Sequence, residues 1–313
     1  MAHPLSRFAG MVAQRAAMLL MLAGVVFVAV ELLPGDMASV TSERGTSAAA
    51  LAARRAELGL DDPLAVRFVR WLGGLVTGDL GVSARGEPIA HLVGAQFPET
   101  LLLGGTALVL TAAGSLVLGC WTAMRPHGPL DRVVTVCATV ALALPEFVVA
   151  SVLVLVFALW AGLLPAVTIT SATGGPASLA MLVLPVLALA IPQIGWNTRI
   201  VRAALADEAD APHVETATLD GLSPRRILTH HVLPGALPTI AAGLVTSSGM
   251  LLGGAVVVET IFTHPGVGAV LAGAVADRDT GVVAAVVALS GTVIAVLLVL
   301  ADAVRTWATG RRP

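Results

Sequence analysis

Six long apolar segments constrain this chain more than any other feature of its sequence. A helix needs roughly 20 mostly apolar residues to cross the hydrocarbon core of a membrane. Apolar residues make up 57% of the chain and charged residues only 12%, whereas a soluble domain carries roughly 25% charged residues. The sequence therefore predicts an all-α integral membrane protein with six transmembrane helices. They are expected near Ala16–Leu33, Thr100–Met124, Val133–Leu164, Leu179–Trp196, Leu237–Val258 and Val282–Val304.

The third segment is longer than one span requires, and Pro145 followed by Glu146 interrupts it. A proline inside a helix removes a backbone hydrogen bond and clashes with the preceding turn, which bends or breaks the helix. A hydrophobic stretch that exceeds the membrane thickness is also accommodated by tilting. The sequence therefore predicts a kink or a tilted entry at this position.

The first segment is expected to be a retained helix, with a cleaved signal peptide as the alternative. Arg7 and Arg15 would suit the basic start of a signal peptide. However, the apolar run is longer than a usual signal-peptide core, and no convincing small-residue cleavage site precedes Pro34. The length of the run favours a membrane span.

The placement of arginine predicts the orientation of the chain. With a cytoplasmic N-terminus, the inner segments hold eleven Arg, whereas the short outer loops near 165–178 and 259–281 hold only Arg278. Because cytoplasmic loops carry an excess of basic residues, both termini are expected in the cytoplasm. The segment 35–99 is left out of this comparison, since loops longer than about 60 residues report poorly on topology. The eleven inner residues are Arg7, Arg15, Arg125, Arg132, Arg199, Arg202, Arg225, Arg226, Arg305, Arg311 and Arg312.

The chain contains no lysine, and all eighteen of its basic residues are arginine. A standard Walker A site needs a lysine to reach the nucleotide phosphates, so this chain cannot hold one. Any ATP and Mg²⁺ would therefore be bound by a separate polypeptide, and we expect no catalytic residue and no cofactor on this chain. The net charge of −2 leaves no basic footprint for nucleic acid. Cys120 and Cys137 lie in apolar stretches and predict neither a disulfide nor a metal site.

The expected domains are residues 1–34 with the first span, an extracytoplasmic segment 35–99, and a five-helix core 100–313. In the outer segment, residues 47–58 are expected to form a short polar helix with Ser47 as N-cap. Residues 64–76 place apolar side chains on one stripe of a helix beside two arginines, which is typical of a helix lying at the membrane interface. The stripe consists of Phe68, Trp71, Leu72 and Leu75.

The longest polar inner segment, residues 203–238, contains the signals for a short helix, a turn and a second helix. Pro212 is well placed to open the first helix, and Gly221 to end it. Ser223 and Pro224 can cap and start a second helix that reaches His231 and leads back to the membrane. Such an element can transmit force if another protein docks on it.

This segment also carries a family resemblance. Glu215-Thr216-Ala217, followed at fixed spacing by Gly221 and by Leu233-Pro234, resembles the EAA loop of binding-protein-dependent ATP-binding-cassette (ABC) permeases. The resemblance extends along nearly the whole chain and narrows to the dipeptide/oligopeptide/nickel permease family. The matching pieces are LPGD at 33–36, LGLDDPL at 58–64, GDLGVS at 78–83, PETL at 98–101, PEF at 145–147, GLSPRRI at 221–227, GGAVVVETIF at 253–262 and PGVG at 265–268.

The resemblance implies a type I ABC importer permease fold in a bacterial inner membrane, with a cytoplasmic coupling helix. It implies pairing with a similar second permease subunit as a heterodimer, two cytoplasmic ABC ATPase subunits docked on the EAA loops, and an external substrate-binding protein. Ala217 and Gly221 would fit a helix that nests in a cleft on the ATPase. The coupling residues carried over are Glu215, Thr216, Ala217, Gly221, Leu222, Arg225, His231, Leu233 and Pro234.

Polar residues within the spans are candidates for the translocation pathway, because burying them in lipid is costly. Structural polar contacts between helices are the alternative. Glu259 lies near the outer boundary and could reach the interface, and Glu146 follows the expected kink. Gln193 and Asn197 lie near the inner end of the fourth span, where a gate could sit. The candidates are Glu146, Gln193, Asn197 and Glu259.

The expected function is import of short peptides delivered by the binding protein, on the family's base rates. Import of nickel or another small solute is the first alternative, and an ion-coupled secondary transporter is a second. The latter would be expected to show inverted repeats, and no convincing internal repeat is present. An intramembrane enzyme is disfavoured because neither an H-E-x-x-H nor a G-x-S-x-G motif occurs.

Overall fold

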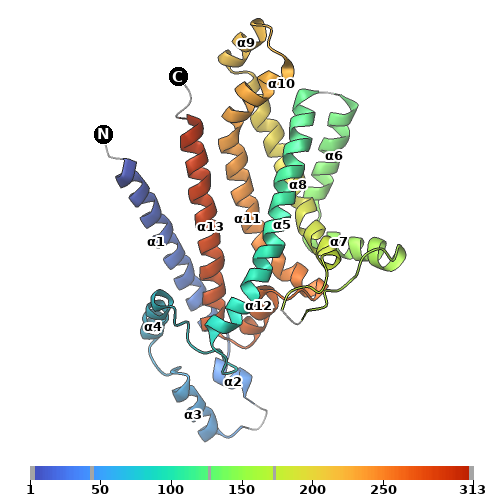
Figure 1. The fold of residues 1–313 in the computed structure, drawn as a ribbon. Coiled ribbons are helices and arrows are strands. Elements are labelled where there is room, and N and C mark those ends of the chain that lie inside the picture. Colours follow the sequence, from blue (N-terminus) through green and yellow to red (C-terminus); the bar gives the residue numbers. More distant parts are fainter. Residues whose placement is uncertain (1–3, 43–45, 126–127, 172–173, 310–313) are drawn as a thin grey trace. The chain divides into compact units, whose positions relative to one another are not determined.

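The computed structural model describes residues 4–42, 46–125, 128–171 and 174–309. Within these ranges every regular element is a helix, accompanied by two isolated β-bridges. Arg311 and Arg312 of the expected cytoplasmic tail lie outside the described residues. The elements (Figure 1) are α1 Pro4–Glu31, α2 Met37–Thr41, α3 Ala48–Glu57, α4 Leu64–Thr77, α5 Ile89–Met124, α6 Pro129–Ala143, α7 Glu146–Leu153, the π-helix η1 Val154–Trp160, α8 Ala180–Ala209, α9 Pro212–Leu219, α10 Pro224–Ile227, the π-helix η2 Leu228–Val232, α11 Leu233–Phe262, α12 Val267–Ala276 and α13 Thr280–Thr309.

Five of the described helices are long and apolar enough to cross a membrane. They are Ala13–Glu31, Ile89–Met124, Ala180–Ala209, Pro224–Phe262 and Thr280–Thr306. A sixth span is obtained if α6 and the following α7–η1 segment are counted as one, although their axes differ by 105°. The six predicted spans correspond to these five helices and this bent pair.

The bend lies where the sequence predicts a kink. α6 ends at Ala143, and Leu144 is extended, with ψ 123°. The residue before a proline is driven out of the helical region by the proline ring, and Pro145 follows directly. α7 then begins at Glu146. A helical segment long enough for one span is therefore divided into two half-length helices.

The chain forms two compact units, each described here by itself. The first unit consists of Met1–Thr100 and Pro265–Ala295. The second consists of Leu101–His264 and Val296–Pro313. The expected boundary near residue 100 coincides with one of these limits, but the first unit also takes in α12 and the first half of α13.

The core of the first unit is assembled from segments far apart in the sequence. Val30 of α1, Ile89 and Val93 of α5, and Val282 and Val286 of α13 are all buried in one cluster. The hydroxyl of Thr100 accepts a hydrogen bond from the backbone N–H of Val267 at 2.9 Å, which ties α12 to α5. Ser47 caps α3 as predicted, because its hydroxyl accepts from the backbone N–H of Ala50 at 3.2 Å.

The apolar stripe of α4 packs on protein. Phe68 and Trp71 stack on each other with ring centroids 6.0 Å apart, and Phe27 of α1 meets Phe68 edge-on at 5.4 Å. Leu72 and Leu75 join the same cluster, which also contains Ala284 of α13. The stripe is covered by α1 and α13, and the location of this helix at the membrane interface stays a prediction. A helix moment identifies an apolar face but not the surface that covers it.

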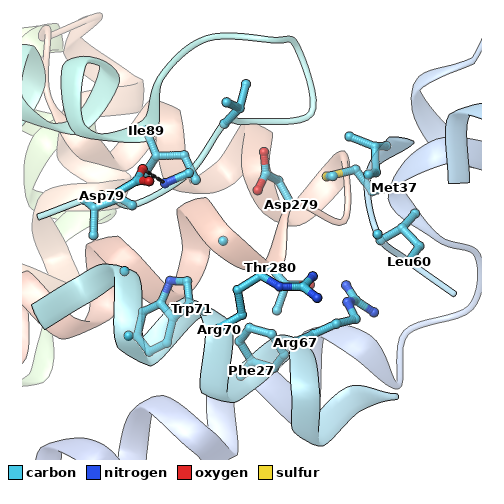
Figure 2. A pocket seen from close by; sticks show the side chains of 18 of the residues that line it. Phe27, Met37, Leu60, Arg67, Arg70, Trp71, Asp79, Ile89, Asp279 and Thr280 are labelled. Atoms are coloured by element: carbon cyan, nitrogen blue, oxygen red, sulfur yellow. Dashed lines mark hydrogen bonds between the residues drawn. The ribbon is translucent and has the colours of Figure 1, made fainter. Parts of the chain in front are cut away.

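Beside α4 the first unit contains a cavity of 590 Å³ (Figure 2). Trp71 lines it together with Arg67 and Arg70 of the same helix (Figure 2). Both guanidinium groups are already paired with carboxylates. Arg67 contacts Glu31 of α1, and Arg70 Nη2 lies 2.7 Å from Asp62 Oδ2. Arg67 therefore ties α4 to α1, whereas Arg70 ties α4 to the turn that precedes it.

Asp279, immediately before α13, is buried and links α13 to the segment around Ala84 in the first unit. Its carboxylate accepts hydrogen bonds from the backbone N–H of Ala84 at 2.6 Å and of Val282 at 3.1 Å. Burial raises the pKa of the Asp279 carboxyl above its ordinary value, and these backbone donors oppose the rise. Arg85 adds a second link on the surface through Asp277, at 2.9 Å.

The second unit has two apolar clusters along α8. In the first, Leu189 packs with Leu103 of α5, Val149 of α7, and Leu251 and Phe262 of α11. The second lies towards the opposite end of α8 and is described with the site below. Close approach of α6 to α8 depends on Gly195, because a Cβ at that position would lie 2.5 Å from the carbonyl oxygen of Ala138.

Candidate functional site

Most residues of the predicted inner loop 203–238 belong to the ends of two long helices. The fourth span was expected to end at Trp196, but α8 continues to Ala209. This stretch contains no glycine or proline before Pro212, so nothing in it stops the helix. On the other side, α10, η2 and α11 form one helix from Pro224 to Phe262. The second helix of the loop is therefore the beginning of the fifth span and not a separate element.

α9 lies between these two ends, beyond both of them (Figure 1). Pro212 occupies its first turn, as predicted. At its end, Gly221 has a φ of +76°, and its N–H donates to the carbonyl of Thr218 at 3.0 Å. The N–H of Leu222 donates to the carbonyl of Ala217 at 3.3 Å. This pair of bonds is the Schellman arrangement, in which glycine adopts the left-handed conformation without steric cost.

One face of α9 is part of the second apolar cluster. Val214 and Ala217 are three residues apart, and both are buried. Val214 packs with Leu205 of α8 and Val232 of η2, in a cluster that extends to Ile240 of α11. Ala217 is only 4% exposed, so its own chain covers it, and the docking of this helix in a cleft on another protein stays a prediction. Its small size lets α9 pack closely on its own chain.

The opposite face of α9 is open. Glu215 and Thr216 are exposed there, and Leu219 is 81% exposed at the end of the helix. A single exposed leucine is common on protein surfaces, so its exposure shows that its own chain leaves this end of α9 uncovered. The sequence analysis missed Leu219. Its signal was available, because Leu219 follows Val214 by five residues and so lies about 140° around the helix from it.

The other predicted coupling residues differ in how far they are exposed to solvent. Gly221 and Arg225 are exposed, whereas Leu222, His231, Leu233 and Pro234 are half-buried. Pro234 lacks a backbone N–H, and the N–H of Leu233 donates to the carbonyl of Leu228, five residues back. This wide turn defines the π-helix η2, and such single-turn bulges are frequent at functional sites.

A hydrogen bond from His213 connects α9 to η2. Its Nε2 lies 3.2 Å from the carbonyl oxygen of His231. Because a carbonyl oxygen only accepts, Nε2 carries the proton in this contact. The same nitrogen lies 3.7 Å from Glu208 Oε1 near the end of α8. Gly235 leaves room for that carboxylate, since a Cβ there would lie 2.3 Å from Glu208 Oε1. His213 thus bridges both long helices from the start of α9.

Gln193 and Asn197 are brought together inside the packing of α8 against α11. Asn197 Nδ2 donates to the carbonyl of Gln193 at 2.9 Å and to Ser247 Oγ of α11 at 2.5 Å. Both side chains are buried. The structure therefore supports the alternative reading, in which these residues make a polar contact between helices.

The two candidate glutamates lie in different surroundings. Glu259 is 1% exposed within α11, so the expectation that it reaches the interface is wrong. Glu146 is half-buried in the first turn of α7. It lies against Gly254 of α11, where a Cβ would be 3.4 Å from its carboxyl carbon. Among the described residues no three His, Cys, Asp or Glu side chains group closely enough to hold a metal ion.

Comparison with protein families gives a match over almost the whole chain. The model of the binding-protein-dependent transport system inner membrane component matches residues 115–311, and the model of the N-terminal part of such components matches residues 6–103. The chain belongs to this permease family. The family resemblance predicted from the sequence motifs is thereby confirmed.

Several curated permeases are similar to this chain over most of their length. It is 32% identical over 290 residues to the oligopeptide transport system permease protein AppB of Bacillus subtilis, covering 88% of this chain and 89% of AppB. It is 30% identical over 289 residues to the dipeptide transport system permease protein DppB of the same organism, covering 92% and 91%. It is also 30% identical to a probable peptide ABC transporter permease protein, y4tP, of Sinorhizobium fredii, covering 88% and 89%.

A solved structure shows the same fold. A chain of the inward-facing MetNI methionine ABC transporter superposes with a TM-score of 0.56 and 19% identity, covering 71% of this chain and 98% of that chain. At this identity the likeness concerns the fold alone. The predicted all-α fold of a type I importer permease is confirmed by it and by the family match.

Proposed function

We propose that this permease is the membrane-spanning subunit of an ATP-driven peptide importer, and that the exposed face of α9 docks a separate ATPase. The observation that carries the proposal is the two-sided construction of α9. Val214 fixes it in the apolar cluster of the second unit and Ala217 is buried, while Leu219 is left 81% exposed. A helix held by close packing on one side and free on the other moves as a rigid body when a partner displaces it.

The contacts of α9 also provide a route by which such a displacement reaches the membrane. Val214 packs on α8 and η2, and His213 bonds the backbone of η2. Both α8 and the helix that begins with α10 continue as membrane-spanning helices. A push on α9 therefore acts on two spans at once. The energy must come from another polypeptide, because a chain without lysine cannot form a standard Walker A site.

The remaining partners and the orientation follow from the same proposal. The family description names a binding protein, which supports an external substrate-binding protein that delivers the cargo. A second, similar permease subunit would complete a heterodimer, and each subunit would dock one ATPase. In this arrangement α9 and both termini lie in the cytoplasm, the membrane is the bacterial inner membrane, and the segment 35–99 is extracytoplasmic.

Among the pathway candidates, Glu146 is the one that we assign to the translocation pathway. It is half-buried, at the point where the chain turns by 105°. A carboxylate at this depth is costly unless it faces a polar space or a partner. Gln193, Asn197 and Glu259 are buried within the unit and are assigned to helix packing.

Short peptides are the substrate class that we propose. The support is that the similar permeases AppB and DppB, covered over about nine-tenths of their length, are named for oligopeptide and dipeptide transport. Nickel chelates and other small solutes remain the alternative outcome of the substrate test described below.

Replacing Leu219 by Glu is expected to release the ATPase while leaving the permease folded. Burying a leucine side chain contributes about 1.5 to 3 kcal/mol, which corresponds to a loss of at least tenfold in affinity when it is removed. The measurement is the amount of ATPase that co-purifies with the full-length permease from its native membranes in mild detergent. Since the side chain is exposed in the permease, the thermal stability of the variant is expected to stay unchanged.

Leu130→Glu is the matched control. Leu130 is also an exposed leucine of the second unit, at the start of α6 and not on α9. This variant is expected to retain the ATPase. Equal retention by wild-type permease and Leu219→Glu would overturn the docking role of α9, and equal loss in both variants would show a general effect of added charge.

Deleting the permease in its host is expected to abolish energy-dependent uptake of labelled di- and oligopeptides. Re-expression of the wild-type chain should restore uptake, and re-expression of Leu219→Glu should not. Uptake of labelled nickel in the same cells is the comparison. If nickel uptake fell while peptide uptake stayed intact, the peptide assignment would be wrong and the docking proposal would be unaffected.

A further inference from the structure

The fifth span begins with a weakened backbone hydrogen-bond ladder. In the π-turn η2, the N–H of Leu233 reaches the carbonyl of Leu228, five residues back. Pro234 and Pro238 follow in α11, and neither has an N–H to donate. Sharp bends in helices occur at prolines and at π-bulges. Residues 224–232 are therefore joined to the rest of the span by a stretch that bends easily.

The inner end of α8 has no such weak point. Residues 197–209 contain neither glycine nor proline and form an uninterrupted α-helix. α9 thus lies between a stiff helix end and a flexible one. The apolar cluster that contains Val214 and Val232 holds α9 against the flexible end, but apolar contacts have no preferred direction. A hydrogen bond, in contrast, fixes both a distance and an angle.

His213 supplies a contact of this directional kind. Its Nε2 donates to the carbonyl oxygen of His231, inside the π-turn, at 3.2 Å. The carboxylate of Glu208 lies 3.7 Å from the same nitrogen, and both neighbours favour the tautomer that carries the proton on Nε2. Gly235 lies against this carboxylate, since a Cβ there would be 2.2 Å from its carbon. Groups from α8, α9, η2 and α11 therefore meet at one point of the second unit.

We infer that His213 is the residue that couples α9 to the fifth span. When an ATPase displaces α9, this bond would carry the start of the span along and bend it at the π-turn and the two prolines. His213 is thus a positioning residue, which acts through the backbone of η2 and not on the cargo. The inference rests on the proposed docking of an ATPase on α9, and it is independent of the identity of the cargo.

The test is the amount of cargo transported per ATP hydrolysed by the complete importer, placed in lipid vesicles and supplied with its binding protein. The cargo is the labelled peptide mixture or labelled nickel, whichever the deletion strain fails to take up. His213→Phe keeps a ring and removes the donor. We expect it to lower the transport per ATP about threefold while hydrolysis continues. This factor is at the lower end for one hydrogen bond, because the His213 side chain is 50% exposed.

Amide hydrogen exchange of the full-length chain in detergent tests the same contact without any cargo. In His213→Phe, exchange is expected to speed up about threefold in α9 and η2, because the bond between them is lost. Exchange in α13 should stay unchanged. Equal exchange rates in the wild-type chain and in this variant would show that the bond does not hold α9 to η2.

Two further variants separate the donor from the ring. His213→Gln carries an amide N–H at about the reach of Nε2, so it is expected to retain transport per ATP close to that of the wild type. His230→Phe is the matched control. His230 is exposed in the same turn, and its ring nitrogen lies 2.7 Å from the hydroxyl of its neighbour Thr229. All three variants should retain the docked ATPase, because Leu219 is unchanged in them.

Unchanged transport per ATP in His213→Phe would overturn the inference and leave the docking of the ATPase intact. Equal losses in His213→Phe and His213→Gln would show that the donor is not responsible, and an equal loss in His230→Phe would show a general effect of an added phenyl ring. Loss of the ATPase from His213→Phe would assign the residue to docking instead of coupling. Absence of the ATPase from the wild-type importer is a separate result, which would overturn the docking proposal and this inference with it.

Discussion

Replacing Arg202 by Leu is expected to destabilise the second unit by about 3 kcal/mol. The guanidinium and Asp131 form a bidentate pair, with Nε to Oδ1 and Nη2 to Oδ2 both at 2.9 Å. The Asp131 side chain is 7% exposed and that of Arg202 is 37% exposed. Removing the arginine takes a positive charge and two hydrogen bonds from a carboxylate inside the unit, and breaking such a pair on one side costs far more than the pair contributes. Denaturant titration in detergent, followed by tryptophan fluorescence, measures the change.

The double variant Asp131→Leu/Arg202→Leu separates this explanation from simple loss of packing. If the cost of the single variant comes from the carboxylate that has lost Arg202, replacing both partners should recover most of the lost stability. Asp131→Leu alone should cost less than Arg202→Leu, because the more exposed arginine can then turn towards water. A double variant as unstable as the sum of the two single variants would contradict the electrostatic explanation.

Replacing Gly195 by Val is expected to separate α6 from α8 and to cost about 3 kcal/mol through overpacking. A Cβ on Gly195 would lie 2.5 Å from the carbonyl oxygen of Ala138 and 3.1 Å from the Cβ of Ala141. Backbone atoms cannot move aside as the end of a flexible side chain can, so the helices themselves must shift. Small residues at helix contacts in membranes allow this close approach. The readout is the same denaturant titration.

Gly105→Val is the control for this variant. Gly105 lies in α5 of the same unit, and a Cβ there would meet no atom within 4 Å. The two variants add the same side chain to a helix of the same unit, so they share the propensity cost and differ only in the contact. Equal destabilisation by both would show that helix propensity, and not the α6–α8 contact, accounts for the loss.

Local signals in the sequence predicted the elements that depend on a single residue. Pro212 opens α9, Gly221 ends it with a φ of +76°, and Ser47 caps α3. The break at Pro145 belongs to the same class, because the proline ring acts on its immediate neighbours. In each case the cause and the effect lie within a few residues of each other.

The roles of particular side chains were less predictable, because they depend on what a distant segment places beside them. Ala217 was expected to fit a helix that nests in a cleft on a partner, yet its side chain is only 4% exposed within its own chain. Leu219, on the other face of the same helix, was overlooked because 57% of the chain is apolar. In such a sequence one more leucine does not stand out as an exposed residue. Asn197 was expected at a gate, but Ser247, fifty residues later, accepts its hydrogen bond.

By itself the sequence determined the class of the protein. Its long uncharged runs require a membrane, its lack of lysine excludes a standard nucleotide site, and the ordered motifs identify the permease family. The tertiary structure decided which face of each helix is covered, the 105° turn after α6, and the continuity of α8 and α11 with the segments that hold α9. The physical reason is that hydrophobic periodicity specifies an apolar face, whereas its partner is selected by packing between residues far apart in the chain.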